Sequence, residues 1–276
     1  MPTVEINDIS IHYERSGRRP AILFVHGMCG DADVFAGQAE RLSNRYCCVR
    51  YDRRGHTRST RGDATQSDAL HADDAAALIG ALDLAPCLLI GSSGGAAIGI
   101  DVALRYGGLL RGAVFSEPPL FSLGPDAARA LTAELVPSVE RSLADGGPRA
   151  AVDTFFSFVC PGLWSSIDEG RKDRYRDNAQ IGLADLRSPS TEATVAELAG
   201  VGVPALVIAG ERSHPSLRAI AGKLAAALPD ARLVELAGSG HVTYAERPDA
   251  FAGAVAAFAA ELDGCTTTSP DRRSRP

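Results

Sequence analysis

Ser93 stands in the segment Gly91-Ser92-Ser93-Gly94-Gly95, between an apolar run with strand character and a small-residue helical pattern that continues from Ala96. A serine on so sharp a strand-to-helix turn has a strained backbone, so the positions two before and two after it must lack bulky side chains. Gly91 and Gly95 meet that requirement. The turn also directs helix N–H groups at any negative charge that forms beside the serine. The spacing favours a nucleophile over the alternative, a glycine-rich turn of an ordinary doubly wound domain.

A serine hydroxyl is a weak nucleophile near neutral pH, so Ser93 needs a base that removes its proton. Among the six histidines of the chain, His241 is the best candidate for this base. It follows Gly240 in a loop after the last predicted strand, where the chain can bring its imidazole over the nucleophile. His26 is expected to shape a loop through hydrogen bonds, a role implied by the family resemblance of its His-Gly motif described below. The other four histidines are expected to be structural or exposed to solvent. His214 is the one among them that lies beyond the same edge of the sheet, so it is also considered.

Apolar runs separated by helical patterns must position these residues. The runs that predict strands are 4–6, 10–14, 21–25, 46–51, the residues before Ser93, 112–116, 204–210 and 232–236. The patterns that predict helices are 33–42, 68–84, the residues after Ser93, 216–228 and 248–262. Strands that alternate with helices predict a parallel sheet, and the first two segments predict an antiparallel hairpin at its edge. Open sheets of this kind build their sites at the carboxyl ends of the strands.

The segment from about Phe121 to Glu197 follows a different pattern, helical and irregular, without a convincing buried strand. It contains six aromatic residues, Phe121, Phe155, Phe156, Phe158, Trp164 and Tyr175. They suit an apolar lid, although most are expected only to pack the helices of the lid itself. We therefore predict a core formed by residues 1–119 and 198–264, a helical lid formed by 120–197, and a polar, proline-containing disordered tail, 265–276.

The amino-acid composition excludes several classes of function. The chain has 276 residues and a formal net charge of −6, without a basic face, which argues against a nucleic-acid partner. No signal core or membrane-length apolar run is present, so we expect a cytoplasmic protein without a membrane partner. The six cysteines are scattered, which suggests neither disulfides nor a zinc site. No metal or organic cofactor is implied, and a homo-oligomer is left open.

Four motifs in order resemble the α/β-hydrolase superfamily over residues 4 to 262: His26-Gly27, Asp52-Arg53-Arg54-Gly55-His56, Gly91-Ser92-Ser93-Gly94-Gly95 and Gly240-His241. The resemblance implies an α/β-hydrolase fold, with a mostly parallel eight-stranded sheet flanked by helices and a helical lid inserted after the sixth strand. It also implies the chain order serine, acid, histidine. The reaction is less specified, because the superfamily includes esterases, lactonases, peptidases, C–C hydrolases, haloperoxidases, lyases and non-catalytic receptors.

The acid of the triad departs from the superfamily's pattern. The usual acid lies three residues beyond Gly210, where this chain has Ser213. A serine cannot hold a charged imidazolium as a carboxylate can. Glu211 is close along the chain but is expected to point away from the site. Glu117 lies at the carboxyl end of the preceding strand, the second place where members of the superfamily have the acid. We predict Glu117, with Glu211 as the alternative acid, and a cap on the start of the lid as the structural alternative for Glu117.

These residues predict hydrolysis of a carboxylic ester or lactone. Ser93 would attack the carbonyl, His241 would shuttle the proton and Glu117 would orient His241. The backbone N–H groups of Met28 and Gly94 would form the oxyanion hole. A serine where haloalkane dehalogenases and epoxide hydrolases have aspartate argues against those reactions. The position of the glutamate resembles zearalenone-type lactone hydrolases, which suggests a lactone. The alternatives are C–C bond hydrolysis of a diketone-type substrate and ligand binding by a non-catalytic member.

Overall fold

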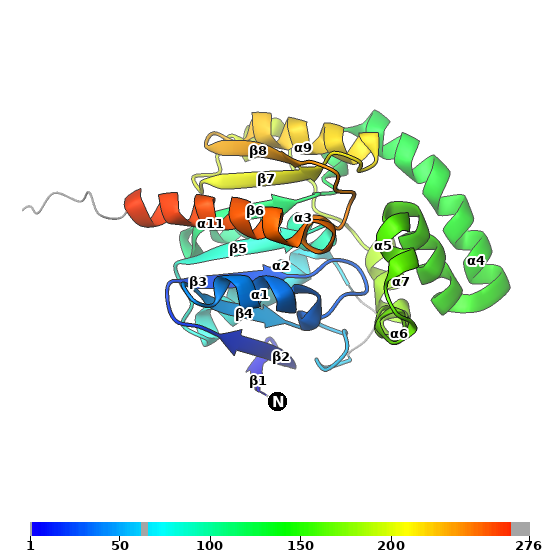
Figure 1. Cartoon of the computed structure of the whole chain (residues 1–276), viewed down its shortest axis with the longest axis horizontal. Coiled ribbons are helices and arrows are strands. Elements are labelled where there is room, and N and C mark those ends of the chain that lie inside the picture. Colours follow the sequence, from blue (N-terminus) through cyan, green and yellow to red (C-terminus); the bar gives the residue numbers. More distant parts are fainter. Residues whose placement is uncertain (1, 62–65, 266–276) are drawn as a thin grey trace, which may run out of the picture.

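The computed structural model describes residues 2–61 and 66–265, and it contains an eight-stranded sheet with helices on both faces (Figure 1). The strands are β1 (Thr3–Ile6), β2 (Ile9–Ser16), β3 (Ala21–Val25), β4 (Cys47–Tyr51), β5 (Cys87–Ser92), β6 (Leu110–Ser116), β7 (Ala205–Gly210) and β8 (Ala231–Leu236). Their order is β1-β2-β4-β3-β5-β6-β7-β8. The β1–β2 and β2–β4 pairs are antiparallel and the other pairs are parallel. The predicted fold, with its antiparallel edge hairpin, is confirmed.

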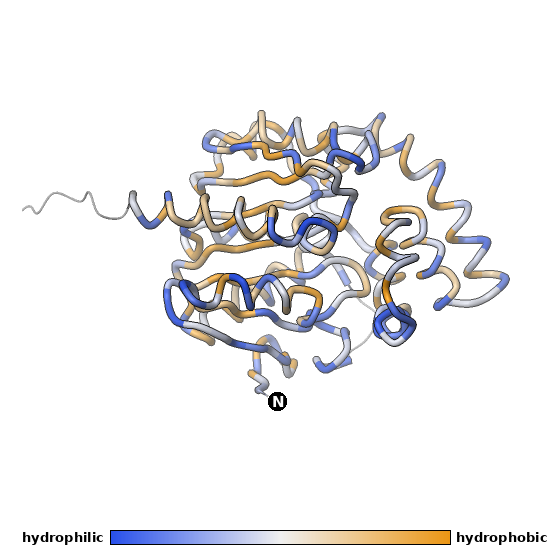
Figure 2. Tube along the Cα trace, viewed as in Figure 1, coloured by the Kyte–Doolittle hydropathy of each residue, from blue (hydrophilic) through white to orange (hydrophobic). Residues whose placement is uncertain are grey.

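Two groups of helices cover the sheet. They are α1 (Ala36–Leu42), which follows the short η1 (Ala32–Phe35), α2 (Asp68–Ala81), α3 (Gly94–Tyr106), α9 (Pro215–Ala227) and α11 (Pro248–Cys265). One apolar core joins α2, α3 and α9 to one face, and a second core joins α1 and α11 to the other. The central strands between them, such as β3 and β7, are continuous hydrophobic stretches (Figure 2). Strands buried on both faces have such runs, instead of alternating apolar and polar residues.

The boundaries of α2 illustrate how local chemistry sets the ends of a helix. Ser67 caps its start, because the Ser67 hydroxyl accepts a hydrogen bond from the Leu70 amide at 3.1 Å. The helix ends at Ala81, three residues before the predicted end at Leu84. Asp83 has a φ of 52°, a left-handed conformation that turns the chain into β5. The apolar residues beyond Ala81 belong to this turn and not to the helix. The predicted helix was too long because it included them.

Four of the helices between β6 and β7 lie beyond the carboxyl ends of the parallel strands (Figure 1). They are α4 (Pro125–Val159), α5 (Pro161–Ser166), α6 (Glu169–Asp177) and α7 (Ala179–Arg187), preceded by the short η3 (Phe121–Leu123). The short α8 (Val195–Leu198) lies instead beside α9, and its Leu198 belongs to the first apolar core. α4 is broken at Gly147, where φ is 77°. A third apolar cluster joins this insertion to Met28, Cys29 and Val242 of the core. The insertion therefore packs on loops at the edge of the sheet where Ser93 lies.

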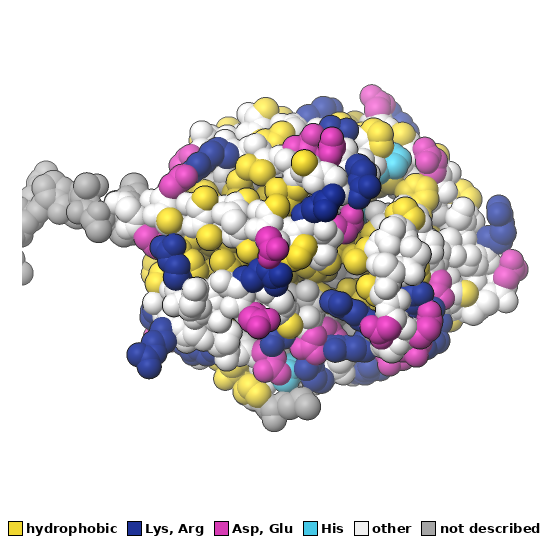
Figure 3. Space-filling model, in the orientation of Figure 1, with side chains coloured by type: hydrophobic (Ala, Val, Ile, Leu, Met, Phe, Trp, Pro, Cys, Tyr) yellow, Lys and Arg dark blue, Asp and Glu magenta, His cyan; other side chains and the backbone are white. Residues whose placement is uncertain are grey.

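The surface charges, the helix lengths and the C-terminal end of the chain add three facts. On the face shown in Figure 3, Lys and Arg side chains are interspersed with Asp and Glu side chains. Within residues 2–61 and 66–265, no helix is long and apolar enough to cross a membrane. The tail predicted to be disordered, 265–276, lies outside the described residues except for the final position of α11.

Candidate active site

Ser93 occupies the turn between β5 and α3 with φ 54° and ψ −125°, a conformation that L-residues rarely adopt. The two flanking glycines make this turn sterically feasible. A Cβ on Gly91 would lie 2.1 Å from the carbonyl oxygen of Gly95, and a Cβ on Gly95 would lie 2.1 Å from the carbonyl oxygen of Val25. A side chain at either position would collide with a backbone carbonyl oxygen, and the backbone cannot move aside as a flexible side chain can. The turn therefore depends on glycine at both positions, and it holds Ser93 at the carboxyl edge of the sheet.

His241 lies in the loop between β8 and the short α10 (Thr243–Glu246). Its Nε2 is 3.0 Å from the Ser93 Oγ, and the residue is buried. The Glu246 carboxylate accepts hydrogen bonds from the amides of Gly240 (2.7 Å) and Val242 (3.2 Å), the two neighbours of His241. Glu246 thus fixes the backbone on both sides of the imidazole. The sequence analysis did not single out Glu246, and its only signal was an acid shortly after the histidine loop.

Glu117 lies just beyond β6, with φ 54° and no exposed surface. Its Oε2 is 3.0 Å from the Nδ1 of His241, on the far side of the ring from Ser93. The amide of Gly210 donates to Oε1 at 2.6 Å, and the hydroxyl of Ser213 donates to Oε2 at 2.5 Å. A buried carboxylate is costly unless donors surround it, and here both oxygens have partners. Ser93, His241 and Glu117 form one continuous chain of hydrogen bonds.

Glu211, the alternative acid, lies elsewhere. Its side chain is exposed, and its Oε2 accepts a hydrogen bond from the amide of Gly238 at 2.6 Å. Gly238 has a φ of 66° in the turn after β8. The carboxylate of Glu211 therefore stabilises this turn, and no described hydrogen bond connects it to His241. Ser213, two residues further on, is the residue that faces Glu117.

Met28 and Gly94 lie close together beside Ser93. A Cβ on Gly27 would be 3.2 Å from the Ser93 Cβ, so the loop after β3 approaches the turn closely. A Cβ on Gly94 would lie 3.9 Å from the Met28 nitrogen. Among the described residues, neither of these two amides donates a hydrogen bond. Two N–H groups next to a serine hydroxyl can receive negative charge that develops on a carbonyl oxygen.

Three of the other histidines belong to a buried network under the insertion. The Arg53 amide donates to His26 Nε2 at 3.0 Å, while the Arg53 guanidinium donates to Asp185 of α7 at 2.7 Å. His71 Nε2 lies 3.3 Å from Asp185. Burial, reinforced by the charge of Arg53, lowers the pKa of His56 to about 3. This network ties α7 to the core and does not touch Ser93. The remaining two histidines contact Glu14 (His12) and the amide of Ser216 (His214).

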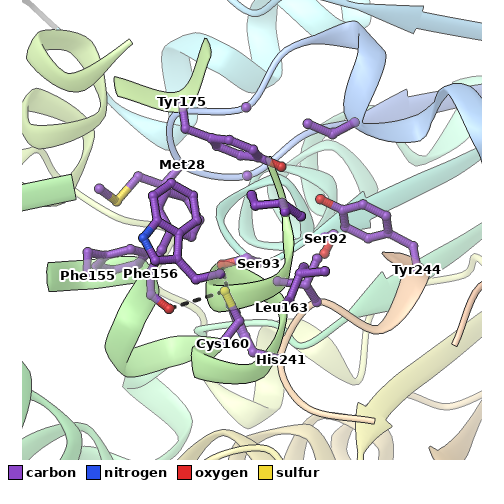
Figure 4. Close-up of a pocket in the computed structure, with 16 residues that line it drawn as sticks. Met28, Ser92, Ser93, Phe155, Phe156, Cys160, Leu163, Tyr175, His241 and Tyr244 are labelled. Carbon is purple, nitrogen blue, oxygen red and sulfur yellow. Dashed lines mark hydrogen bonds between the residues drawn. The ribbon is translucent and has the colours of Figure 1, made fainter. Parts of the chain in front are cut away.

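A small apolar pocket of about 40 Å³ adjoins Ser93 and His241 (Figure 4). Phe155, Phe156 and Trp164 of the insertion line it. Phe156 stacks on Trp164 with 4.8 Å between ring centroids, so these rings pack the insertion and also form the pocket wall. The expectation that most of the aromatics only pack the lid is therefore incomplete. A second, larger pocket of about 310 Å³ shares Tyr175 with the first.

Tyr175 of α6 and Tyr244 of α10 meet across the pocket, with their hydroxyls directed toward each other (Figure 4). Burial raises the pKa of Tyr175 to about 12 and that of Tyr244 well above its usual value. Both phenols are therefore neutral near pH 7. This pair connects the insertion to the core across the site.

The remaining reactive side chain in the pocket is Cys160. Its Sγ donates to the Phe156 carbonyl at 3.3 Å (Figure 4). Burial raises the pKa of the Cys160 thiol to about 12, so it is protonated and a poor nucleophile. Within the described part of the chain, no group of three or more His, Cys, Asp or Glu side chains could hold a metal ion. Among the pocket side chains, Ser93 has the base contact that a nucleophile requires.

Known proteins share this architecture. The family described as the alpha/beta hydrolase family matches residues 22–254. The chain is 28% identical over 264 residues to 2-(acetamidomethylene)succinate hydrolase of Mesorhizobium japonicum, covering 92% of this chain and 93% of that protein. An uncharacterized hydrolase of Bacillus subtilis, YraK, is 39% identical over 123 residues, so the chain spans less than half of that relative (45%).

Solved structures agree in fold. The enol-lactonase of Burkholderia xenovorans superposes with a TM-score of 0.78 at 23% identity, covering 94% of this chain and 100% of that one. A likeness at this identity shows the fold alone. The family match covers most of the chain, and the relatives named above are hydrolases. The chain therefore belongs to the alpha/beta hydrolase family, and it is a hydrolase.

Proposed function

We propose that this protein is a serine hydrolase that cleaves a carboxylic ester or lactone through an acyl-enzyme. The observation that supports it most directly is the hydrogen-bond chain from Ser93 Oγ through the two nitrogens of His241 to Glu117, with both contacts at 3.0 Å. An acid, a histidine and a serine in this order make the serine hydroxyl a nucleophile.

The reaction begins with attack of the Ser93 Oγ on the carbonyl carbon, while His241 Nε2 takes the hydroxyl proton. The carboxylate of Glu117 stabilises the imidazolium that forms. The N–H groups of Met28 and Gly94 receive the oxyanion of the tetrahedral intermediate. His241 then protonates the departing alkoxide, leaving an acyl group on Ser93. Water, deprotonated by His241, hydrolyses this ester and releases the acid.

The pocket supports an acyl group of limited size. Its walls beside Ser93 are largely aromatic and aliphatic, and the free volume is about 40 Å³. In this proposal the segment 120–197 acts as a lid whose rings exclude water and select the acyl chain. The larger adjoining pocket, about 310 Å³, accommodates the alcohol side of an ester or the rest of a lactone ring.

The names of two similar proteins agree with this reaction class. One is an enol-lactonase, and an N-acyl homoserine lactone degrading enzyme has the same fold with a TM-score of 0.71 at 23% identity. These likenesses concern the fold, so they favour a lactone only as the first substrate class to test. A meta-cleavage product hydrolase also has this fold, with a TM-score of 0.71 at 20% identity. C–C bond cleavage is therefore the alternative reaction, and the same experiment tests it.

The experiment compares wild type with Ser93→Ala on p-nitrophenyl esters of increasing acyl length, on small and macrocyclic lactones, and on dienoic diketones. We expect ester or lactone turnover by wild type and a loss on the order of 10⁵-fold in kcat in Ser93→Ala. A fluorophosphonate probe should label wild type but not Ser93→Ala. Ser216→Ala is the control, because this buried serine has no described contact with His241 or Glu117. Cleavage of diketones alone, or equal rates in wild type and Ser93→Ala, would contradict the proposal.

A further inference from the structure

Ser213 occupies the position where the superfamily usually has the acid, and it faces the glutamate that replaces that acid. It lies three residues beyond the end of β7 and is 6% exposed. Its amide donates to the Gly210 carbonyl at 3.0 Å, which fixes the turn. Its hydroxyl donates to Glu117 Oε2 at 2.5 Å. The same oxygen is 3.0 Å from His241 Nδ1, so Ser213 and His241 share one acceptor.

The two oxygens of Glu117 are held by different parts of one turn. The backbone amide of Gly210 holds Oε1 at 2.6 Å, and the Ser213 hydroxyl holds Oε2. Two donors on the two oxygens fix the rotation of the carboxylate about its last bond. Gly210 contributes through its backbone, and a Cβ on it would lie 2.1 Å from the Gly240 carbonyl oxygen, so no substitution at Gly210 tests this contact alone. The Ser213 hydroxyl is the contact that a single substitution removes.

We propose that Ser213 is a positioning residue for the reaction: its hydroxyl holds Oε2 of Glu117 against His241 Nδ1. This inference rests on the proposed function, because it assigns Ser213 an effect on His241 acting as the base. A role confined to satisfying a buried carboxylate is the structural alternative, and it affects folding without changing kcat in the folded protein.

The expected effect on the rate follows from the shared oxygen. Without the Ser213 hydroxyl, Oε2 keeps its contact with His241, and the Gly210 amide alone holds the carboxylate to the turn after β7. The carboxylate can then rotate away from His241 Nδ1, so the ring is held less well in the orientation that faces Ser93. Because this loss affects the chemical step and not the walls of the pocket, kcat should fall while KM changes little.

The other polar side chains near His241 do not connect it to Ser213. Glu246 of α10 binds the backbone on both sides of the histidine. Cys160 and Tyr175 of the insertion and Tyr244 of α10 line the same pocket. Burial keeps the thiol and both phenols protonated. None of these four side chains has a described contact with Ser213, so a change at Ser213 acts on His241 through Glu117.

The experiment measures kcat and KM of Ser213→Ala and Ser213→Thr on the best substrate of the panel. We expect Ser213→Ala to lower kcat about tenfold with little change in KM. Ser213→Thr retains a hydroxyl and should recover most of the lost kcat. Ser216→Ala, which changes a neighbouring buried serine without a described contact to Glu117, should match wild type.

Thermal unfolding separates positioning from folding. Each variant is compared at a temperature well below its midpoint, and Ser213→Gly replaces Ser213→Ala if the alanine variant does not fold. A wild-type kcat in the folded hydroxyl-free variant would overturn the inference. So would a loss of stability with an unchanged kcat/KM, or a folded threonine variant as slow as alanine. The Ser93→Ala comparison is independent: if it retains wild-type turnover, the proposed function fails, whatever Ser213 does.

Discussion

The carboxyl ends of β6 and β7 each have a glutamate, and the two side chains have opposite surroundings. Glu117, after β6, is fully buried and binds the Gly210 amide, the Ser213 hydroxyl and His241. Glu211, after β7, is exposed and binds only the Gly238 amide among the described contacts. The two residues have the same side chain and follow neighbouring strands of the same sheet. Chemical type therefore does not distinguish them.

Backbone direction distinguishes them. The amide of Glu117 donates to the Ile208 carbonyl at 2.8 Å, and a φ of 54° then turns its side chain under the loop after β7. The amide of Glu211 likewise donates to the next strand, to the Leu236 carbonyl of β8 at 3.1 Å, but Glu211 lacks the positive φ of Glu117. The comparison teaches that the backbone conformation just after the strand decides whether a carboxylate there points toward the histidine.

The largest effect expected from this comparison is that of Glu117→Gln. The amide keeps the size of the side chain but removes the charge that stabilises the His241 imidazolium, and it can bind the wrong tautomer of the ring. We expect kcat to fall about 10³- to 10⁴-fold, as measured by steady-state hydrolysis of the best substrate. Binding of a non-hydrolysable substrate analogue should change little. A variant with near wild-type turnover would remove Glu117 from the proposed triad.

A smaller effect, a partial recovery of kcat, is expected when the acid is moved from the end of β6 to the end of β7. The Ser213 hydroxyl lies 2.5 Å from Glu117 Oε2, so an aspartate at 213 can place a carboxylate near His241 once Glu117 is shortened. We expect Glu117→Ala/Ser213→Asp to be about 10- to 100-fold faster in kcat than Glu117→Ala alone. The control is Glu117→Ala/Ser216→Asp, which adds the same charge nearby. Equal rates in the two double variants would show that position 213 cannot supply the acid.

The smallest effect is expected for Glu211→Gln. Its carboxylate accepts one hydrogen bond, from the Gly238 amide, and a glutamine oxygen can accept the same bond. We expect kcat within about twofold of wild type, because an exposed contact of this kind contributes little. The measurement is made beside Glu117→Gln under identical conditions. A large loss of kcat in Glu211→Gln with an intact Glu117 would reverse the comparison and identify Glu211 as the acid.

Several features of the molecule could be predicted from short stretches of sequence. The mostly parallel sheet follows from apolar runs that alternate with helical patterns, and it was predicted with strand bounds within two residues of those in the structure at nearly every end. The turn at Ser93 was predicted with its requirement for small neighbours, since its steric demands involve residues a few positions apart. A Cβ on either flanking glycine would lie 2.1 Å from a carbonyl oxygen.

Other features depend on residues far apart in the chain. The contact of Ser213 with Glu117 joins positions 96 residues apart, and no local pattern contains it. The sequence analysis treated Ser213 only as a missing acid, because a serine signals no role until its partner is known. The aromatics of the insertion are a similar case. Their dual contact, with one another and with the pocket, depends on how α4 to α6 pack against the loops of the core.

The sequence by itself determined the mostly parallel sheet and the Ser93 turn, because these follow from hydrophobic periodicity and from steric limits within a few residues. The order serine, acid, histidine came from the resemblance to the superfamily. Tertiary structure decided between Glu117 and the alternative Glu211 as the partner of His241, and it decided which rings face the pocket and that Ser213 binds Glu117. Each of these depends on where separate strand ends and loops converge, and that convergence is fixed only when both faces of the sheet are packed.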